Sequence, residues 1–185
     1  MEFFMLERDK RIKSSITLND MQNFFSSGIA QRLNDNDKSA EIFFLEEDKE
    51  YEYVDFIFFE SSIAIMHKEY KNYIIISDKL KPVFSKYNPK ILFKPLGLIN
   101  REENRQYLYW ICMIAPAIAT DRIMQENEDL YPLVKPYYTN RIIRLEYKLE
   151  SRFIITLEVA ESILRRNCLG ATLEKITIGV DQNEH

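Results

Sequence analysis

The sequence predicts an α+β fold in which a few helices cover a mixed or mainly antiparallel sheet. Apolar runs typical of strands follow one another along the chain, with few helical segments between them. Hydrophobic residues make up 46% of the 185 residues, which is enough to bury a core, and the low counts of 4 glycines and 6 prolines argue against disorder or a long linker. We therefore expect a single domain over residues 1–185.

The first seventy residues contain several short apolar runs. We predict a short strand at FFML, a short helix in LNDMQNFFSSGIAQRL and a turn-rich loop at NDNDKS. The runs EIFFLEE, VDFIFF and SSIAIM predict three further strands. Between the first two of them lies EEDKEYEY, which predicts a charged hairpin connection or a solvated edge.

In the middle of the chain, KNYIIIS predicts a strand and SDKLKPVFSKY predicts a helix. The helical spacing places Leu80, Val83, Phe84 and Tyr87 on one face. Because Pro82 has no amide proton, we expect the helix to begin near it. KILFKPLGLI and RQYLYWICMIA then predict two strands.

The last third mixes strands with two helices. Thr120 or Asp121 is expected to start a helix in TDRIMQENEDL, and two prolines interrupt PLVKPYY. IIRLEY and RFIIT predict strands, a helix is predicted from about Leu157 to Asn167, and LEKITI predicts a strand after a break at Gly170. We expect Thr156 to cap this last helix.

A similar pattern occurs twice, eighty positions apart. YIIISDKLKPVF and FIITLEVAESIL each run from a strand-like patch into a helix-like one. A shift of eighty pairs Ile74 with Ile154, Phe84 with Leu164 and, further on, Phe93 with Leu173. Identities are few, so two interpretations stay open. Either the chain contains two similar strand–helix–strand units, or the similarity is only what any two strand–helix–strand units would show. In both cases these positions are predicted to be core.

Charge and cysteine content restrict the partners and the compartment. A net charge of -4 disfavours nucleic acid as the main partner and suits a basic protein better, although Arg141, Arg144 and Arg152 could form a local basic patch. Cys112 and Cys168 predict buried free thiols in a reducing compartment. The longest apolar run is far shorter than the roughly 20 residues of a membrane span, and no signal peptide is expected. We predict a cytoplasmic protein without membrane contact.

The sequence contains few groups suited to catalysis. His185 is terminal, so His67 is the one realistic imidazole for acid–base chemistry, and a lone histidine beside an apolar run is more often structural. There is no glycine-rich phosphate loop, no nucleophile motif and no metal-ligand spacing. The acidic runs at residues 46–52 and 126–129 are more typical of solvated faces than of metal sites. We therefore expect no catalytic residues, no metal and no cofactor.

Tyrosines are the remaining candidates for a binding surface, because their rings have an apolar body and a polar tip. Tyr51 and Tyr53 alternate with acids in EYEYVD, a pattern typical of a strand with one wet face. They could equally be ordinary half-buried strand tyrosines.

The stretches YIIISDKLKPVFSKYNPKILFKPLGL, YLYWICMIAPAIATDRI and IIRLEYKLESRFIITLEVAESILRRNCLGATLEKI resemble a bacterial family of polymorphic-toxin immunity proteins, the type usually numbered eleven. Phe93, Lys94 and Pro95 match the step that ends a strand in that family, and the resemblance covers about residues 71–180. The chain departs from the family after Asp121, where DRIMQE lacks the expected serine. Residues 1–70 match no part of the family.

The resemblance implies a cytoplasmic protein that binds a cognate toxin and neutralises it by occlusion, without catalysis. Our candidates for toxin binding lie in the first acidic run and are Glu46, Glu47, Asp48, Glu50, Tyr51 and Glu52. The main alternative is a non-catalytic adaptor or a protein that self-associates through an exposed strand edge. An enzyme that uses His67 is a third. The sequence does not predict an oligomeric state.

Overall fold

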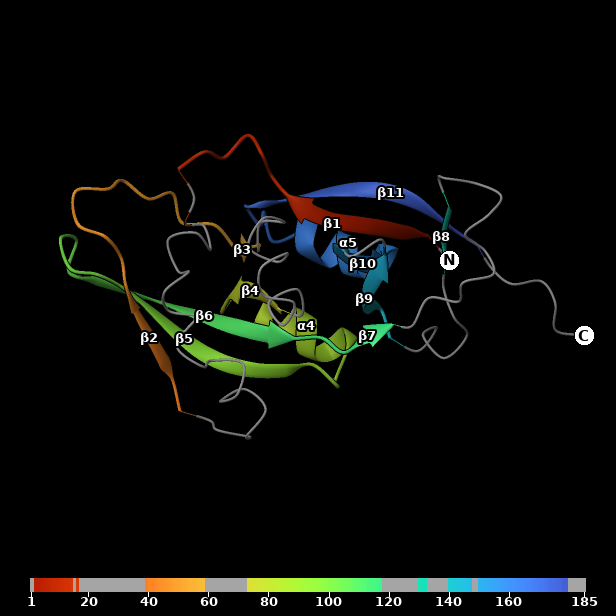
Figure 1. Ribbon diagram of the computed structural model, residues 1–185, viewed down its shortest axis with the longest axis horizontal. Coiled ribbons are helices and arrows are strands. Elements are labelled where there is room, and N and C mark those ends of the chain that lie inside the picture. The colour runs from red at the N-terminus through yellow and green to blue at the C-terminus, as the bar shows by residue number, and fades with distance from the viewer. Residues whose placement is uncertain are drawn as a thin grey trace, which may run out of the picture.

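The computed structural model describes residues 2–14, 16, 39–58, 73–117, 130–132, 140–147 and 150–179. Within these ranges the chain forms a six-stranded sheet, a five-stranded sheet and two helices. Figure 1 shows the helices lying between the sheets. The predicted α+β class, with mixed sheets and few helices, is confirmed.

The five-stranded sheet has the order β2-β5-β6-β4-β3. Strand β2 runs parallel to β5, and the other neighbours are antiparallel. The buried pair Lys94–Glu41, with Nζ 3.4 Å from Oε1, adds a side-chain link between β5 and β2. The strands are β2 (Glu41–Phe44), β3 (Phe56–Ile57), β4 (Tyr73–Ser77), β5 (Leu92–Asn100) and β6 (Arg105–Met113).

The six-stranded sheet has the order β7-β9-β10-β1-β11-β8. Its four central strands are antiparallel, and each outer strand runs parallel to its neighbour. The chain's first strand therefore lies between two of its last. The strands are β1 (Phe3–Arg8), β7 (Pro116–Ala117), β8 (Leu130–Pro132), β9 (Ile142–Tyr147), β10 (Glu150–Thr156) and β11 (Ala171–Gly179).

The two helices are short and begin where the sequence predicts. Helix α4 (Lys81–Tyr87) has Pro82 in its first turn, where a missing amide proton costs no hydrogen bond. Helix α5 (Leu157–Leu164) follows β10 directly. Thr156 is at its N-cap position, but the hydroxyl makes no capping hydrogen bond, so the expected cap is present in position only.

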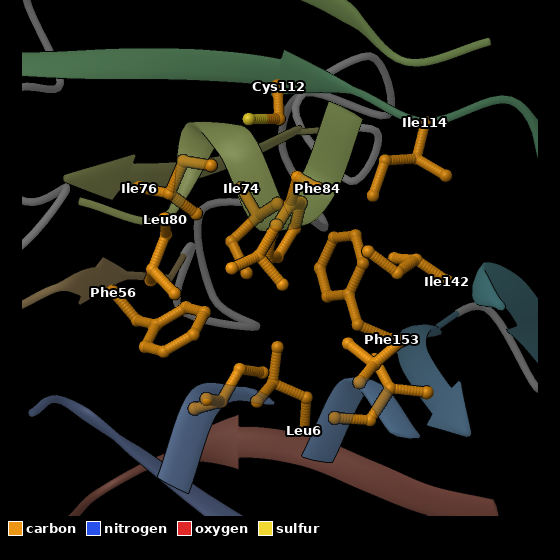
Figure 2. Close-up of a cluster of buried hydrophobic side chains, with 14 of the residues drawn as sticks. Leu6, Phe56, Ile74, Ile76, Leu80, Phe84, Cys112, Ile114, Ile142 and Phe153 are labelled. Carbon is orange, nitrogen blue, oxygen red and sulfur yellow. The ribbon is translucent and has the colours of Figure 1, made fainter. Parts of the chain in front are cut away.

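The main core fills the space between the sheets. Figure 2 shows side chains from both sheets and both helices converging there, with Phe84 and Phe153 near its centre. A second buried cluster, which includes Leu96, Tyr109 and Ile111, lies on the opposite face of the five-stranded sheet. The free thiol of Cys112 is fully buried, as predicted, while that of Cys168 is only partly buried. No described helix is long and apolar enough to cross a membrane.

The two predicted strand–helix–strand units are present, one in each sheet. In the first, α4 connects β4 to β5, and β6 lies between these strands and antiparallel to both. In the second, α5 connects β10 to β11, and β1 takes the place of β6. The flanking strands also correspond, since β3 and β9 pair antiparallel with the first strand of each unit, and β2 and β8 pair parallel with the last.

The gapless shift of eighty does not survive in the first strands or the helices. Ile74 and Ile76 of β4 face the core between the sheets, whereas in β10 the residues that face it are Phe153 and Ile155. Faces alternate along a strand, and the inward positions are even-numbered in β4 but odd-numbered in β10. An even shift therefore pairs a residue that faces this core with one that faces away from it. The helices fail too, since Leu164 is 63% exposed while its expected partner Phe84 is buried.

In the last strands, the shift of eighty does hold. Phe93 lies in register with Ile74 through Cys112 of β6, and Leu173 lies in register with Phe153 through Leu6 of β1. Both Phe93 and Leu173 pack against the main core. A three-residue turn separates β4 from α4, whereas α5 follows β10 without a turn. The shift that relates the two helices therefore differs from the shift that relates the strands before them.

A junction around Asp55 connects the two sheets. The Asp55 carboxylate accepts hydrogen bonds from the Ser77 hydroxyl at 2.6 Å and from the Leu169 amide at 2.8 Å. Its own amide donates to the Leu169 carbonyl at 2.8 Å. Next to Leu169, Gly170 has a φ of 98° and accepts a hydrogen bond from the amide of Asp9. The loop between α5 and β11 is thereby fixed to β3, β4 and the end of β1.

Replacing Gly170 should destabilise the fold strongly. Its positive φ disfavours a side chain, and a Cβ there would lie 2.7 Å from the Phe56 carbonyl oxygen and 2.8 Å from the Val54 Cβ. We expect Gly170→Ala to lower the free energy of unfolding by about 2–4 kcal/mol, measured by urea denaturation. Gly97→Ala is the matched control, because there the nearest atom is the movable amide of Gln106 at 3.2 Å. Equal losses in the two variants would contradict this account of the junction.

The end of β1 should make stability depend on acid pH. Hydrogen bonds from the Arg11 side chain and amide lower the pKa of Asp9 to about 2 from its ordinary value of 3.8. A lowered pKa contributes stability above the ordinary value, and this contribution is lost as the pH falls through the folded-state value. We expect Asp9→Asn to flatten the decline in the urea midpoint between about pH 4 and pH 2. An unchanged slope in that window would exclude Asp9 as a source of acid sensitivity.

Candidate protein-binding site

The predicted acidic run forms one end of the molecule together with a second acidic segment. We call residues 46–52 and 101–105 the acidic tip. The first segment follows β2, and the second is the turn between β5 and β6 with the first residue of β6. The amide of Asp48 donates to Glu102 Oε1 at 3.1 Å, so the two segments are in contact. Figure 1 shows both at the end of the molecule farthest from the C-terminus.

The acidic tip contains the whole excess of negative charge in the sequence. Its two segments contain seven acidic residues and three basic ones, Lys49, Arg101 and Arg105. The chain as a whole has 29 acids and 25 bases, so the residues outside the tip carry equal numbers of each. All the charged side chains of the tip are exposed. Such a concentration of charge gives the molecule a directional field that attracts a basic surface.

Backbone hydrogen bonds fix the first segment of the tip. The Glu46 amide donates to the Tyr51 hydroxyl at 3.2 Å, and the Glu52 amide donates to the Ser14 carbonyl at 2.9 Å. Between them Asp48 has a φ of 62°, a conformation that aspartate tolerates better than most residues. The predicted alternation holds, because Glu50 and Glu52 are exposed while Tyr51 and Tyr53 are half-buried, but the segment forms a single bridge and no regular strand.

Two stacked tyrosines support the second segment. The rings of Tyr53 and Tyr107 lie 3.7 Å apart, centroid to centroid, with 23° between their planes. Both hydroxyls donate to Glu103 Oε2, at 3.2 Å and 3.1 Å. The Asn100 side chain donates to the Tyr53 hydroxyl at 2.9 Å. Burial, more than its polar neighbours, raises the pKa of Tyr53. Two tyrosine hydroxyls therefore hold the Glu103 carboxylate in place.

All six residues predicted for toxin binding lie in the acidic tip. Sequence reasoning missed Glu102 and Glu103, which come from a turn about fifty residues further on, and missed their supports Asn100 and Tyr107. The segment REEN between two predicted strands was a visible sign of a charged turn. Nothing in the sequence indicated that this turn would meet the first acidic run.

The three arginines considered as a possible local basic patch are not free to act as one. Arg144 is buried, and its Nε donates to the Ile114 carbonyl at 2.8 Å. Arg141 pairs with Glu158 at 2.9 Å, and Arg152 pairs with Glu7 at 2.8 Å. One of the three charges is therefore inaccessible, and the other two are paired with acids.

Several other predictions fall outside the described residues. They are the helix in LNDMQNFFSSGIAQRL, the loop NDNDKS apart from Ser39, the strand SSIAIM with His67, the helix expected from Thr120 or Asp121 apart from its last residue, the acidic run at 126–129 and the segment PLVKPYY apart from its first proline. The last residue of that expected helix, Leu130, lies in strand β8. Within the described part of the chain, no group of three or more histidine, cysteine or acidic side chains is placed to hold a metal ion.

No protein-family model, curated protein or solved structure matches this chain. The resemblance to immunity proteins therefore stays a prediction, and the functional argument rests on the geometry of the tip.

The tyrosine pair should contribute unequally to stability. Tyr53→Phe removes the hydroxyl that accepts from the buried amide of Asn100, so we expect the free energy of unfolding to fall by about 1–2 kcal/mol. Tyr107→Phe keeps the ring stack and removes an exposed hydrogen bond, so its loss should be under about 1 kcal/mol. Urea denaturation of both variants provides the measurement. A larger loss for Tyr107→Phe would show that the support of the tip is assigned wrongly.

Proposed function

We propose that this protein is an immunity protein that binds a bacterial toxin and neutralises it by occlusion, without catalysis. The observation that carries the proposal is the acidic tip, where the excess negative charge of the chain is concentrated on exposed side chains. The resemblance of residues 71–180 to an immunity family supplies the kind of partner.

The tip has the properties that tight recognition of a basic protein requires. A concentrated field of one sign accelerates encounter with an oppositely charged surface. The contacts of Asp48 with Glu102 and of Tyr53 with Glu103 order the two segments before binding. Preordered side chains lose less conformational freedom when a complex forms, which favours high affinity.

Co-expression tests the proposal directly. We expect the product of the adjacent gene to be toxic when expressed alone in a bacterial host and harmless when expressed together with this chain. A stable complex should copurify from the second culture. Toxicity that persists in the presence of well-folded protein, or an adjacent product with no toxicity, would contradict the proposal.

Charge reversal tests the role of the tip in the same complex. We expect Glu46→Lys, Glu47→Lys and Asp48→Lys together to lower the association rate constant by roughly 10–100-fold at low salt and to weaken its salt dependence. The dissociation rate should change less. Stopped-flow mixing at several salt concentrations measures these constants.

The matched control reverses three exposed acids far from the tip, namely Glu2, which precedes β1, Glu161 of α5 and Glu174 of β11. It makes the same change in net charge, and the exposed ion pairs that it breaks contribute little stability. Association rates that fall equally in both triple variants would show that net charge matters and the position of the tip does not.

Self-association is the second candidate, because β2 lies at the edge of its sheet and exposes Ile42 and Phe44. Sedimentation of the purified protein over a hundredfold range of concentration distinguishes the two functions. A concentration-dependent dimer without any complex with the adjacent product would favour self-association.

A further inference from the structure

Three large apolar side chains are exposed beside the acidic tip. Ile42, Phe44 and Leu108 have 52%, 48% and 44% of their surface exposed. We call them the apolar patch. Ile42 lies in register with Gly97, and Gly97 lies in register with Leu108, so the first and last point to the same side of the sheet. Phe44 lies two residues after Ile42 and shares this side.

The apolar patch is on the face of the five-stranded sheet that carries the helices. Cys112 of β6 is on the same side as Leu108 and is fully buried in the main core. Strands β5 and β6 have 9 residues each, a length of about 30 Å, whereas the 7 residues of α4 span only about 10 Å. Figure 1 shows both strands extending past α4 toward their connecting turn, where β2 lies. The helix is therefore too short to cover this end of the face.

The patch and the acidic tip form one continuous surface. Phe44 is two residues before Glu46, and the guanidinium of Arg101, which belongs to the tip, lies 4.2 Å from the centroid of the Phe44 ring. The buried Lys94–Glu41 pair fixes β2 at this place. An apolar centre beside a charged rim is the arrangement found in protein interfaces, where burial of a few large side chains provides most of the affinity.

We propose that the apolar patch is the anchor point for a basic protein partner, whose contacting segment presents apolar side chains between lysines or arginines. The inference rests on the proposed function in so far as that partner is the toxin. It goes further because it assigns separate roles to the two surfaces. The tip attracts the partner through charge, and the patch holds the bound partner through apolar contacts. The partner's apolar side chains contact Ile42, Phe44 and Leu108, and its basic side chains lie against the acids of the tip.

Charge favours this occupant over a second copy of the chain. A two-fold contact of patch against patch would bring two acidic tips to the same interface. Like charges placed together oppose association, whereas a basic partner neutralises them.

A peptide of stated composition tests the anchor without knowledge of the partner. The probe is a nine-residue peptide of alternating lysine and leucine, and the comparison peptides replace either leucine by serine or lysine by glutamate. We expect the lysine–leucine peptide to bind in fluorescence anisotropy titrations and both comparison peptides to bind at least roughly tenfold more weakly. Equal binding of the lysine–serine peptide would overturn the proposal, because charge alone would then explain the affinity.

Matched variants locate the binding. The double variant Ile42→Ser and Leu108→Ser should weaken the lysine–leucine peptide at least about tenfold. The double variant Leu164→Ser and Leu169→Ser removes two leucines of similar exposure near α5 and should leave binding within about twofold. Equal losses in both would overturn the assignment. Hydrogen exchange of the unmodified protein gives an independent readout, since the peptide should protect amides in β2 and leave those of α5 unchanged.

The adjacent gene product separates this inference from the proposed function. A toxin complex that forms equally well with the Ile42→Ser and Leu108→Ser variant would overturn the anchor and leave the immunity function standing. Peptide binding at the patch without any toxin complex would support the anchor and overturn the immunity function. A dimer of the unmodified protein that the same variant dissociates would show that a second copy occupies the patch, and would overturn the proposal.

Discussion

The two short helices can be stable only between the two sheets, and the rest of the structure depends on this constraint. Helices of 7 and 8 residues are too short to persist in water on their own, so tertiary packing must supply their stability. Val83 and Phe84 of α4 and Val159 and Ile163 of α5 pack into one core with side chains from both sheets. Neither strand–helix–strand unit buries its helix alone. The two units therefore share a single core, although each sheet has a complete order of its own.

The second strand–helix–strand unit is complete only when β1 pairs between β10 and β11. Strand β1 occupies in the six-stranded sheet the place that β6 occupies in the five-stranded one, so the first strand completes a unit whose other strands follow much later. The Asp9 amide bonds to Gly170, and Asp55 bonds to Leu169, at the place where β1, β3 and the α5–β11 loop meet. These contacts join residues far apart in sequence and connect the two units directly. Folding must bring the chain's ends together before the second sheet is complete.

Local signals in the sequence were sufficient for most of the described elements but not for their arrangement, and they did not indicate the short outer strands β7 and β8. Apolar runs predicted β4, β5, β6, β9 and β10 correctly, and Pro82 and Gly170 marked the start of α4 and the break after α5. The repeat was recognisable because packing imposes the same pattern on both units. Its offset was wrong in β10 and α5 because sequence similarity is insensitive to which face of a strand is buried. The membership of β1 and the contact between Asp48 and Glu102 depend on long-range pairing, for which a single sequence provides no local signal.

The division into scaffold and surface follows from the lengths of the elements. In the part of the chain that the structure describes, the helices cover the sheet near β4 and do not extend over the far ends of β5 and β6 (Figure 1). At those ends β2 is paired with β5 along its length, and the Lys94–Glu41 pair links the same two strands. A strand surface positions side chains more accurately than a loop does. In the proposed interface the acidic loops act at longer range through their charge, while Ile42, Phe44 and Leu108 provide the apolar contact. The repeated pattern in YIIISDKLKPVF thus belongs to the frame. The surface proposed for recognition comes from residues 41–52 and 101–108, which comprise β2, the first residues of β6 and the acidic segments next to them.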